Sequence, residues 1–471
     1  DRLRTSLREV AGEGLEMRSK PVSSGAAIVL SVPTSMAGSI ETAFTRAGVQ
    51  EVPVPPSYGG KSVAEAVPKL LARLQAIPAE IEELDATLDL LRREEIPEVL
   101  GALAAFHDRL ARLETKTRAR RTAHAFVLGG WVPEAERLAL ETELHERFEG
   151  KLAMERVGGA ELAEGSVPVA LENPKLFRPF EALVKFLPLP HYGTIDPTPF
   201  VAVFFPMFFG LILGDVGYGA LLAILAWILH RRSEPESLLS SLAKIGGACA
   251  AFSVLFGLLY GELFGDLGHE LLGMPSLWFR REEALLPFLG LALALGFVHI
   301  LLGLVLGVLG ALRRGRREAL GRGVAAVMIV MILIAILAAA EILPPAFFTP
   351  SIVALLVAFP LLVVAEGLLA PIELLASLSN IFSYARIMAI GTASVMMAVV
   401  ANRMVGAVGS VVVGVLFALL FHLVNFVLGV FSPTIHALRL HYVEFFGKFY
   451  RPGGPDYDPL RHWATDRRER K

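Results

Sequence analysis

Residues 200–229 decide the fold, and they read FVAVFFPMFFGLILGDVGYGALLAILAWIL. This run of 30 residues holds one charged side chain, Asp215. A helix needs about 20 apolar residues to cross the hydrocarbon core of a bilayer. The run therefore predicts insertion into a membrane, either as one long helix or as two short helices broken between Gly214 and Gly219.

Further apolar runs follow toward the C-terminus, at about residues 242–264, 284–311, 323–342, 351–370, 374–402 and 404–449. Of the 471 residues, 54% are hydrophobic and 19% are charged, against about 25% charged in a typical soluble domain. This composition excludes a wholly soluble protein and an intrinsically disordered one. Because the charge density falls near residue 198, we expect a water-soluble arm over 1–197, a membrane domain over 198–450 and a tail over 451–471.

The basic residues choose between one and two helices in the first run, because cytoplasmic loops are enriched in Lys and Arg. If the arm is cytoplasmic and the first run spans twice, most loop cations lie on the cytoplasmic side. These are Arg231, Arg232, Lys244, Arg313, Arg314, Arg316, Arg317, Arg322 and the basic tail 467–471. The other side then holds only Arg280, Arg281 and Arg403. We therefore predict an α-helical protein of the cell membrane with about eight spans, the last two long and tilted, and both termini cytoplasmic.

Composition also restricts the ligands. A formal net charge of −2 provides no basic field for nucleic acid. The single cysteine, Cys249, lies in an apolar run and excludes an intramolecular disulfide and a Cys-based metal site. We expect no nucleic acid, no cofactor and no metal ion. The chain begins at Asp1 without a signal-peptide pattern, which leaves open whether residues precede it.

The soluble part predicts two small α/β lobes, around residues 20–60 and 122–160. In the first lobe we expect a strand over 25–33, a helix over 34–47 and a strand over 49–54. In the second lobe the same order recurs as a strand over 124–132, a helix over 133–148 and a strand over 151–157. Repeated strand–helix–strand units are typical of small α/β layers, so we predict an α+β arm.

A long helix over about 62–121 is predicted between the lobes. Its apolar residues Ile77, Ile81, Leu84, Leu88 and Leu91 step alternately by four and three, and a similar seam continues through residues 96–113. Such heptads indicate a coiled coil, and the prolines at positions 78 and 97 are expected to kink it. The partner of the seam is open: an upstream segment, a nearby helix or another subunit. The plainer alternative is a surface helix of an ordinary domain.

The sequence Gly59-Gly60-Lys61-Ser62 precedes this helix and invites a P-loop interpretation. The P-loop pattern requires a further glycine where this chain has Pro55, and no long buried strand comes before it. A polar turn is the better interpretation.

Ionisable side chains within the apolar runs are functional candidates, because an ionised group is costly at mid-membrane. Arg386 lies near the centre of the predicted seventh span, with no acid within one helical turn. Arg439 lies late in the eighth span, three residues after His436, so the two share a helix face. The structural alternatives are a salt bridge to another span for Arg386 and snorkelling to the interface for Arg439.

Acidic residues cluster at two opposite depths in the predicted topology. Asp215, Glu262 and Asp266 fall at the outer ends of spans, and Glu366 and Glu373 at the inner ends. With Arg386 between them, this is the expected layout of two aqueous half-channels separated by a fixed cation. Each acid taken singly is also compatible with an ordinary helix-end role.

Three mid-span polar residues leave their roles open. His299 in the fourth span is either a proton relay or a hydrogen-bonded structural residue, and His422 and Asn425 in the eighth span are similar.

Three of these segments resemble subunit a, or subunit I in prokaryotes, of the rotary V-type and archaeal-type (V/A) ATPases. Residues 204–219, FFPMFFGLILGDVGYG, are similar to the first membrane signature of that family. Residues 373–390, ELLASLSNIFSYARIMAI, resemble the segment with its essential arginine, and residues 436–444, HALRLHYVE, resemble the segment with its second arginine. The soluble part fits the family's cytoplasmic arm, which has two α/β lobes joined by an antiparallel coiled coil.

The resemblance implies a stator subunit that couples proton translocation to ATP synthesis or hydrolysis and has no catalytic site of its own. Its implied partners are a rotating ring of small proteolipid c/L subunits, peripheral-stalk subunits of E/G type, membrane lipid and, indirectly, the central stalk and the ATP-hydrolysing A/B head. A ring carboxylate is neutralised from one half-channel, turns through the lipid and ionises at the other. Arg386 favours the ionised carboxylate, because arginine keeps its charge at any working pH.

One position departs from the family pattern. Eukaryotic members often carry a glutamate about ten residues before the second arginine, where this chain has Gly429. The half-channels must therefore use other groups. The alternatives are a secondary ion transporter, which predicts matched broken helices in an internal repeat, and a membrane-anchored scaffold with structural buried charges. The direction of ATP turnover, the choice of proton over sodium and the ring stoichiometry stay open.

Overall fold

The computed structural model describes residues 16–22, 25–31, 35, 38, 63–157, 167–312, 315–407 and 409–460. The chain divides into two compact units, residues 1–102 and 103–471. The described part is mostly helical, and its strands form two small two-stranded sheets.

In the first unit, β1 (Glu16–Val22) pairs antiparallel with β2 (Gly25–Ser31), with Glu16 opposite Ser31 and Val22 opposite Gly25. β2 confirms the strand predicted over 25–33, and the sequence analysis missed β1. The helix predicted over 34–47, apart from residues 35 and 38, the strand predicted over 49–54 and the Gly-Gly-Lys-Ser turn lie outside the described residues.

The long arm helix is confirmed. It consists of α3 (Val63–Leu90), a π-helical segment (Leu91–Glu95) and α4 (Ile96–Arg118). Pro78 lies inside α3, and Pro97 is the second residue of α4, directly after the π-helical segment. A proline ring removes a backbone donor and clashes with the carbonyl four residues earlier, which explains a local change of helix type just before Pro97.

The apolar seam of the arm helix faces solvent. Leu84 is 63% exposed and Phe106 is 73% exposed. Among the described residues no second helix covers the seam, so the antiparallel pairing stays a prediction.

The second predicted lobe is only partly present. α5 (Glu134–Phe148) confirms the helix predicted over 133–148. The strand predicted over 124–132 was wrong beyond a two-residue pair, β3 (Arg120–Arg121) with β4 (Phe126–Val127), and the strand predicted over 151–157 was also wrong, because that segment is irregular. A strand needs a neighbour to satisfy its backbone and cover its side chains, whereas Phe126 is 69% exposed here.

The first apolar run forms two helices, α7 (Thr198–Leu213) and α8 (Val216–Arg232), which confirms the predicted break. Gly214 ends α7 in the left-handed region with φ of 34°, and Asp215 is the N-cap of α8. Glycine adopts this backbone conformation without the steric cost that a side chain brings.

The remaining membrane domain follows the predicted runs closely. Its elements are the short α6 (Glu181–Val184), then α9 (Leu238–Tyr260), the short α10 (Leu267–Leu272), α11 (Leu285–Leu312), α12 (Arg316–Ala339), α13 (Phe348–Glu366), α14 (Ala370–Phe382), α15 (Ala385–Ala407) and α16 (Val411–Arg439). A second π-helical segment (Leu440–Phe445) and a 3-10 turn (Phe446–Lys448) extend α16.

In the described part of the chain, six helical segments are long and apolar enough to cross a membrane. They include the segments Ala370–Ala407, which contains α14 and α15, and Val411–Lys448, of 38 residues each. α7 is a shorter apolar helix of 16 residues and α8 has 17 residues. The protein is therefore a multi-pass membrane protein, and the eight-span count stays a prediction.

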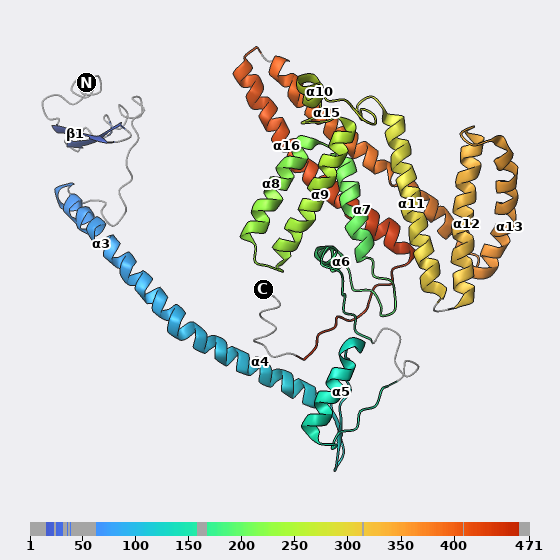
Figure 1. Cartoon of the computed structure of the whole chain (residues 1–471). Coiled ribbons are helices and arrows are strands. Elements are labelled where there is room, and N and C mark those ends of the chain that lie inside the picture. The colour runs from blue at the N-terminus through green and yellow to red at the C-terminus, as the bar shows by residue number, and fades with distance from the viewer. Residues whose placement is uncertain are drawn as a thin grey trace. The chain divides into compact units, whose positions relative to one another are not determined.

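Helix α7 occupies the centre of the membrane domain, where it packs against α9, α15 and α16. Its Phe205, Phe208 and Phe209 are almost completely buried in the core. α8 pairs with α9, α12 pairs with α13, and α11 links these groups by packing on both α12 and α15. Figure 1 shows α15 and α16 crossing the other helices obliquely, and their tilt in a membrane stays a prediction.

The described part of the C-terminal tail returns to the segment that precedes α7. The backbone N–H of Val169 donates to the carbonyl of Pro455 at 2.9 Å, and the N–H of His191 donates to Arg451 at 3.0 Å. The tail thus holds the chain segment that leads into α7 and the membrane domain.

Candidate functional site

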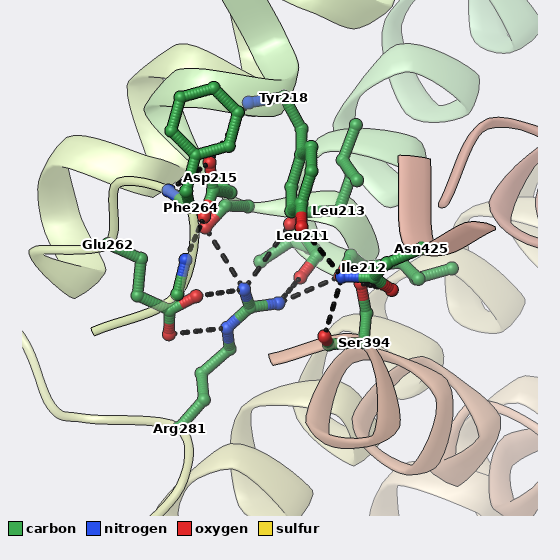
Figure 2. A network of polar contacts seen from close by, with 12 residues as sticks. Leu211, Ile212, Leu213, Asp215, Tyr218, Glu262, Phe264, Arg281, Ser394 and Asn425 are labelled. Carbon is green, nitrogen blue, oxygen red and sulfur yellow. Dashed lines mark hydrogen bonds and ion pairs between the residues drawn. The ribbon is translucent and has the colours of Figure 1, made fainter. Parts of the chain in front are cut away.

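The break between α7 and α8 is organised by Asp215. Its carboxylate is 2% exposed and accepts hydrogen bonds from the backbone N–H groups of Tyr218 at 3.0 Å, Phe264 at 3.0 Å and Gly265 at 2.7 Å. It therefore caps α8 and binds the loop that follows α9, as Figure 2 shows. Asp215 has three partners within its own chain, all of them backbone donors.

Arg281, in the loop before α11, also contacts the break between α7 and α8. It is 1% exposed and forms a buried ion pair with Glu262, to which its Nε donates at 2.9 Å. Its other nitrogens donate to carbonyls at the C-terminal end of α7, including Ile212 at 2.8 Å and Gly214 at 3.0 Å (Figure 2). A cation at a helix C-terminus is favourable because the last carbonyls lack helical partners.

The sequence analysis counted Arg281 only as a loop cation and missed this role. Burial raises the pKa of the Glu262 carboxyl, and the Arg281 guanidinium opposes that shift.

A chain of polar contacts leads from Asp266 into the helix bundle. Asn402 of α15 donates to Asp266 and to the carbonyl of Phe264, and its amide oxygen contacts His422 Nε2 at 2.9 Å. His422 Nδ1 contacts the Tyr218 hydroxyl at 2.7 Å.

The polar chain continues beyond Tyr218 along α15 and α16. The Tyr218 hydroxyl accepts from Asn425 at 3.1 Å, and Asn425 also donates to the carbonyl of Ser394 at 3.0 Å. The structure therefore gives partners to His422 and Asn425, and it adds Tyr218 and Asn402, which the sequence analysis did not single out. Glycine-rich spacing around Tyr218 was the only sequence signal near them.

Asp266 and Glu262 also line a small pocket at this end of the bundle. The pocket has a volume of about 20 Å³, and its other polar lining residues are Tyr260, His269, Arg280 and Glu282. The three outer acids of the sequence analysis thus lie together, two of them at one small polar pocket.

Arg386 lies in the first turn of α15, directly after the break that separates α14 from α15. Its side chain is 24% exposed, and its Nη1 lies 3.8 Å from Oε1 of Glu444, whose side chain is 2% exposed. The sequence analysis missed Glu444, because 58 positions separate it from Arg386 and only the fold brings them together.

His436 and Arg439 join the same cluster from α16. Arg386 and Arg439 both act electrostatically on His436, and both also act on Glu444. Nδ1 of His436 is buried without a hydrogen-bond partner. We name Arg386, His436, Arg439 and Glu444 the arginine cluster. The π-helical segment that follows Arg439 contains Glu444, and π-helical turns are frequent at functional sites.

The inner acids lie near each other as well. Glu366, at the end of α13, interacts electrostatically with Glu373 of α14 and with Arg322 of α12. Glu373 also acts on Lys448, whose Nζ donates to Ser377 at 2.8 Å. Glu366 is half-buried and Glu373 is exposed on the surface of this chain.

His299 is fully buried in an aromatic cluster. Its Nδ1 contacts the Tyr384 hydroxyl at 2.6 Å, and its ring stacks on Phe445 with a centroid distance of 3.9 Å. Nε2 of His299 is buried without a hydrogen-bond partner. Tyr384 comes two residues before Arg386, so His299 lies beside the arginine cluster rather than with either group of acids.

Positions along helix α15 give the separation between the arginine cluster and the two groups of acids. Asn402, which contacts Asp266, follows Arg386 by 16 residues in the same helix, about 24 Å along its axis. Glu373 precedes Arg386 by 13 residues in α14, on the other side of the break. The arginine cluster therefore lies between the outer and the inner acids along the chain of α14 and α15.

These features define a class: a multi-pass membrane protein whose interior holds a partly exposed arginine between two groups of acids. Comparison with known proteins shows which proteins this chain resembles. Residues 111–239 and 372–462 match the V-type ATPase 116kDa subunit family. These ranges contain Asp215, Arg386 and Arg439, and the chain is similar to subunit I of A-type ATP synthases.

Several curated relatives have the name A-type ATP synthase subunit I. The protein of Methanocaldococcus jannaschii is 26% identical over 89% of this chain and 66% of its own length. That of Archaeoglobus fulgidus is 30% identical over 72% of this chain and 58% of its own length. That of Halobacterium salinarum is 28% identical over 85% of this chain and 70% of its own length. The chain thus spans 58% to 70% of the length of these relatives.

Proposed function

We propose that this chain is the stator subunit of a rotary V/A-type ATPase or synthase and forms two proton half-channels against a rotating ring of small membrane subunits. The observation that carries the proposal is the position of Arg386. It is a partly exposed cation at a helix break, between outer and inner acids. Such a residue is costly in a membrane unless it meets a partner.

The outer half-channel begins at the pocket lined by Glu262 and Asp266. From Asp266 the polar chain of Asn402, His422, Tyr218 and Asn425 gives hydrogen-bonding groups that conduct a proton inward. Asp215 holds the loop and the start of α8 in place beside this route.

The inner half-channel begins at Glu373 and Glu366. Glu373 is exposed on the chain surface, Glu366 is half-buried, and Lys448 and Arg322 act electrostatically with them. His436 and His299 lie closer to Arg386 and are the candidate relay groups there.

Arg386 keeps the two half-channels apart. A ring carboxylate that faces the guanidinium is favoured in its ionised form, and the permanent positive charge repels a proton that would pass directly between the channels. A carboxylate that has received a proton is neutral, so it enters the lipid with the rotating ring. Exposed apolar side chains along α16, among them Leu416, Leu423 and Phe431, offer a surface on which such a ring slides.

The arm is proposed to be cytoplasmic and to resist the torque of the ring through peripheral-stalk subunits. The long helix of α3 and α4 and its exposed apolar seam support this role, because the seam needs a partner to cover it. Both termini are then cytoplasmic, and ATP turnover belongs to other subunits of the complex.

The test is Arg386→Ala in the complete complex, reconstituted in liposomes. We expect assembly with the ring to persist and ATP-driven proton uptake to disappear. The matched control is Arg403→Ala, because Arg403 is an exposed arginine of the same helix. Unchanged coupled transport in the Arg386 variant would leave only a scaffold role. Transport that follows sodium instead of protons would overturn the choice of ion.

A further inference from the structure

Glu444 is an unusual buried carboxylate. It is 2% exposed, yet its Oε2 has no hydrogen-bond partner. Its Oε1 lies 3.8 Å from Nη1 of Arg386, close enough for charge attraction but too far for a hydrogen bond, and that Nη1 also lacks a hydrogen-bond partner. Buried ionic groups are normally satisfied by several hydrogen bonds, whereas here no hydrogen bond joins the two charged groups and the further side-chain partner of Glu444 is Ser383.

The pair of Arg281 and Glu262 in the same protein provides the contrast. There both carboxylate oxygens accept from the guanidinium, and the remaining donors are satisfied by carbonyls of α7. In that pair the Arg281 side chain is 1% exposed and the Glu262 side chain is 8% exposed, whereas the Arg386 side chain is 24% exposed. Arg386 thus faces Glu444, and its partly exposed guanidinium keeps N–H donors that have no hydrogen-bond partner.

A second cation, Arg439, lies beside the open pair. Arg439 and His436 lie near enough to act electrostatically, and Glu444 is the acid that faces these groups within the arginine cluster. Without Glu444 the cluster would hold two arginines and no counter-charge among its members. A carboxylate that arrives there from a partner would then be held by an unopposed pair of cations.

We propose that Glu444 is the intrachain counter-ion of Arg386. Glu444 holds the guanidinium loosely between two arrivals of a rotor carboxylate. It also weakens the attraction between Arg386 and that carboxylate enough for the carboxylate to leave. This proposal rests on the proposed function. Glu444 is a positioning residue here, since it acts on the rotor carboxylate through Arg386. The geometry fits the role because Nη1 of Arg386 reaches Glu444 without forming a hydrogen bond that would have to break.

The variant Glu444→Gln removes the charge and keeps the shape, and the complete complex in liposomes is the sample. We expect normal assembly, a fall of several-fold in the maximal rate of ATP-driven proton uptake and an unchanged number of protons moved per ATP. The rate falls because the rotor carboxylate leaves Arg386 more slowly, and the coupling persists because Arg386 still separates the half-channels. Glu444→Asp keeps the charge and should recover most of the rate.

The matched control is Glu270→Gln, because Glu270 is an exposed acid in α10. A wild-type rate for Glu444→Gln, or equal damage from Gln and Asp, would overturn the counter-ion role in favour of packing. Loss of coupling would assign Glu444 to a half-channel instead. Arg386→Ala in the same preparation separates the two proposals: if it abolishes transport while Glu444→Gln has no effect, only the counter-ion proposal fails.

Discussion

Arg281 and Glu262 form a buried ion pair that also closes the C-terminal end of α7, since the same guanidinium donates to the carbonyls of Ile212 and Gly214. Tyr260 adds its ring to this arrangement, with its centroid 4.7 Å from the guanidinium carbon. One loop residue thereby links α7, α9 and the segment before α11.

Replacing Arg281 with Met should destabilise the protein by about 3–5 kcal/mol, because it leaves Glu262 buried without its counter-charge. The measurement is thermal unfolding of the purified protein in detergent. The neighbouring Arg280→Met is the control, since Arg280 pairs with Glu282 and Glu283 at the surface and should cost less than about 1 kcal/mol. Equal losses from the two variants would contradict the structural role of Arg281.

The close approach of α9 to the α7–α8 break predicts a second stability effect. A Cβ at Gly257 would lie 2.5 Å from the backbone nitrogen of Val216 and 2.7 Å from the carbonyl carbon of Asp215. Gly257→Ala should therefore cost about 1–3 kcal/mol, because backbone atoms cannot move aside easily. Gly247→Ala in the same helix has open space around it and should be neutral or slightly stabilising. Thermal unfolding in detergent compares the pair.

Tyr218 tests the outer pathway. Tyr218→Phe removes the hydroxyl that joins His422 to Asn425 and keeps the buried ring. We expect slower proton flux in the reconstituted complex and an unchanged assembly, because the ring still fills its place in the core. Tyr192→Phe is the control, since Tyr192 is 70% exposed. A rate equal to that of the wild type would remove Tyr218 from the pathway.

A further prediction concerns the acids that we assign to the two half-channels. Asp215→Asn, Glu366→Gln and Glu373→Gln should each slow passive proton flow through the reconstituted membrane part. For Asp215 part of the loss will be structural, because an amide nitrogen cannot accept the hydrogen bond that Gly265 donates. The exposed Glu373 lacks this complication and gives the cleanest result. Unchanged flow in all three variants would discard the assignment of these acids to half-channels.

Much of the membrane domain was predictable from the sequence. Apolar runs of sufficient length predict helices because the bilayer forces the backbone to satisfy its own hydrogen bonds, and α9, α11 and α12 lie close to the predicted ranges. The glycines around Asp215 marked the position of a possible break, and the distribution of basic loop residues predicted that α7 and α8 are separate helices. In the arm, heptads predicted the long helix correctly, whereas the strands predicted over 124–132 and 151–157 failed, because a strand depends on partners that a local pattern does not specify.

The sequence by itself determined the membrane helices and marked Arg386 and Arg439 as functional candidates, since each follows from local pattern or from the cost of charge in lipid. Only the tertiary structure decided which charges meet. Arg281 contacts Glu262 and the end of α7, and Arg386 lies beside Glu444, which is 58 positions away in the sequence. An electrostatic contact depends on distance in space, and in a bundle that distance is set by how helices pack, which no spacing along one helix records.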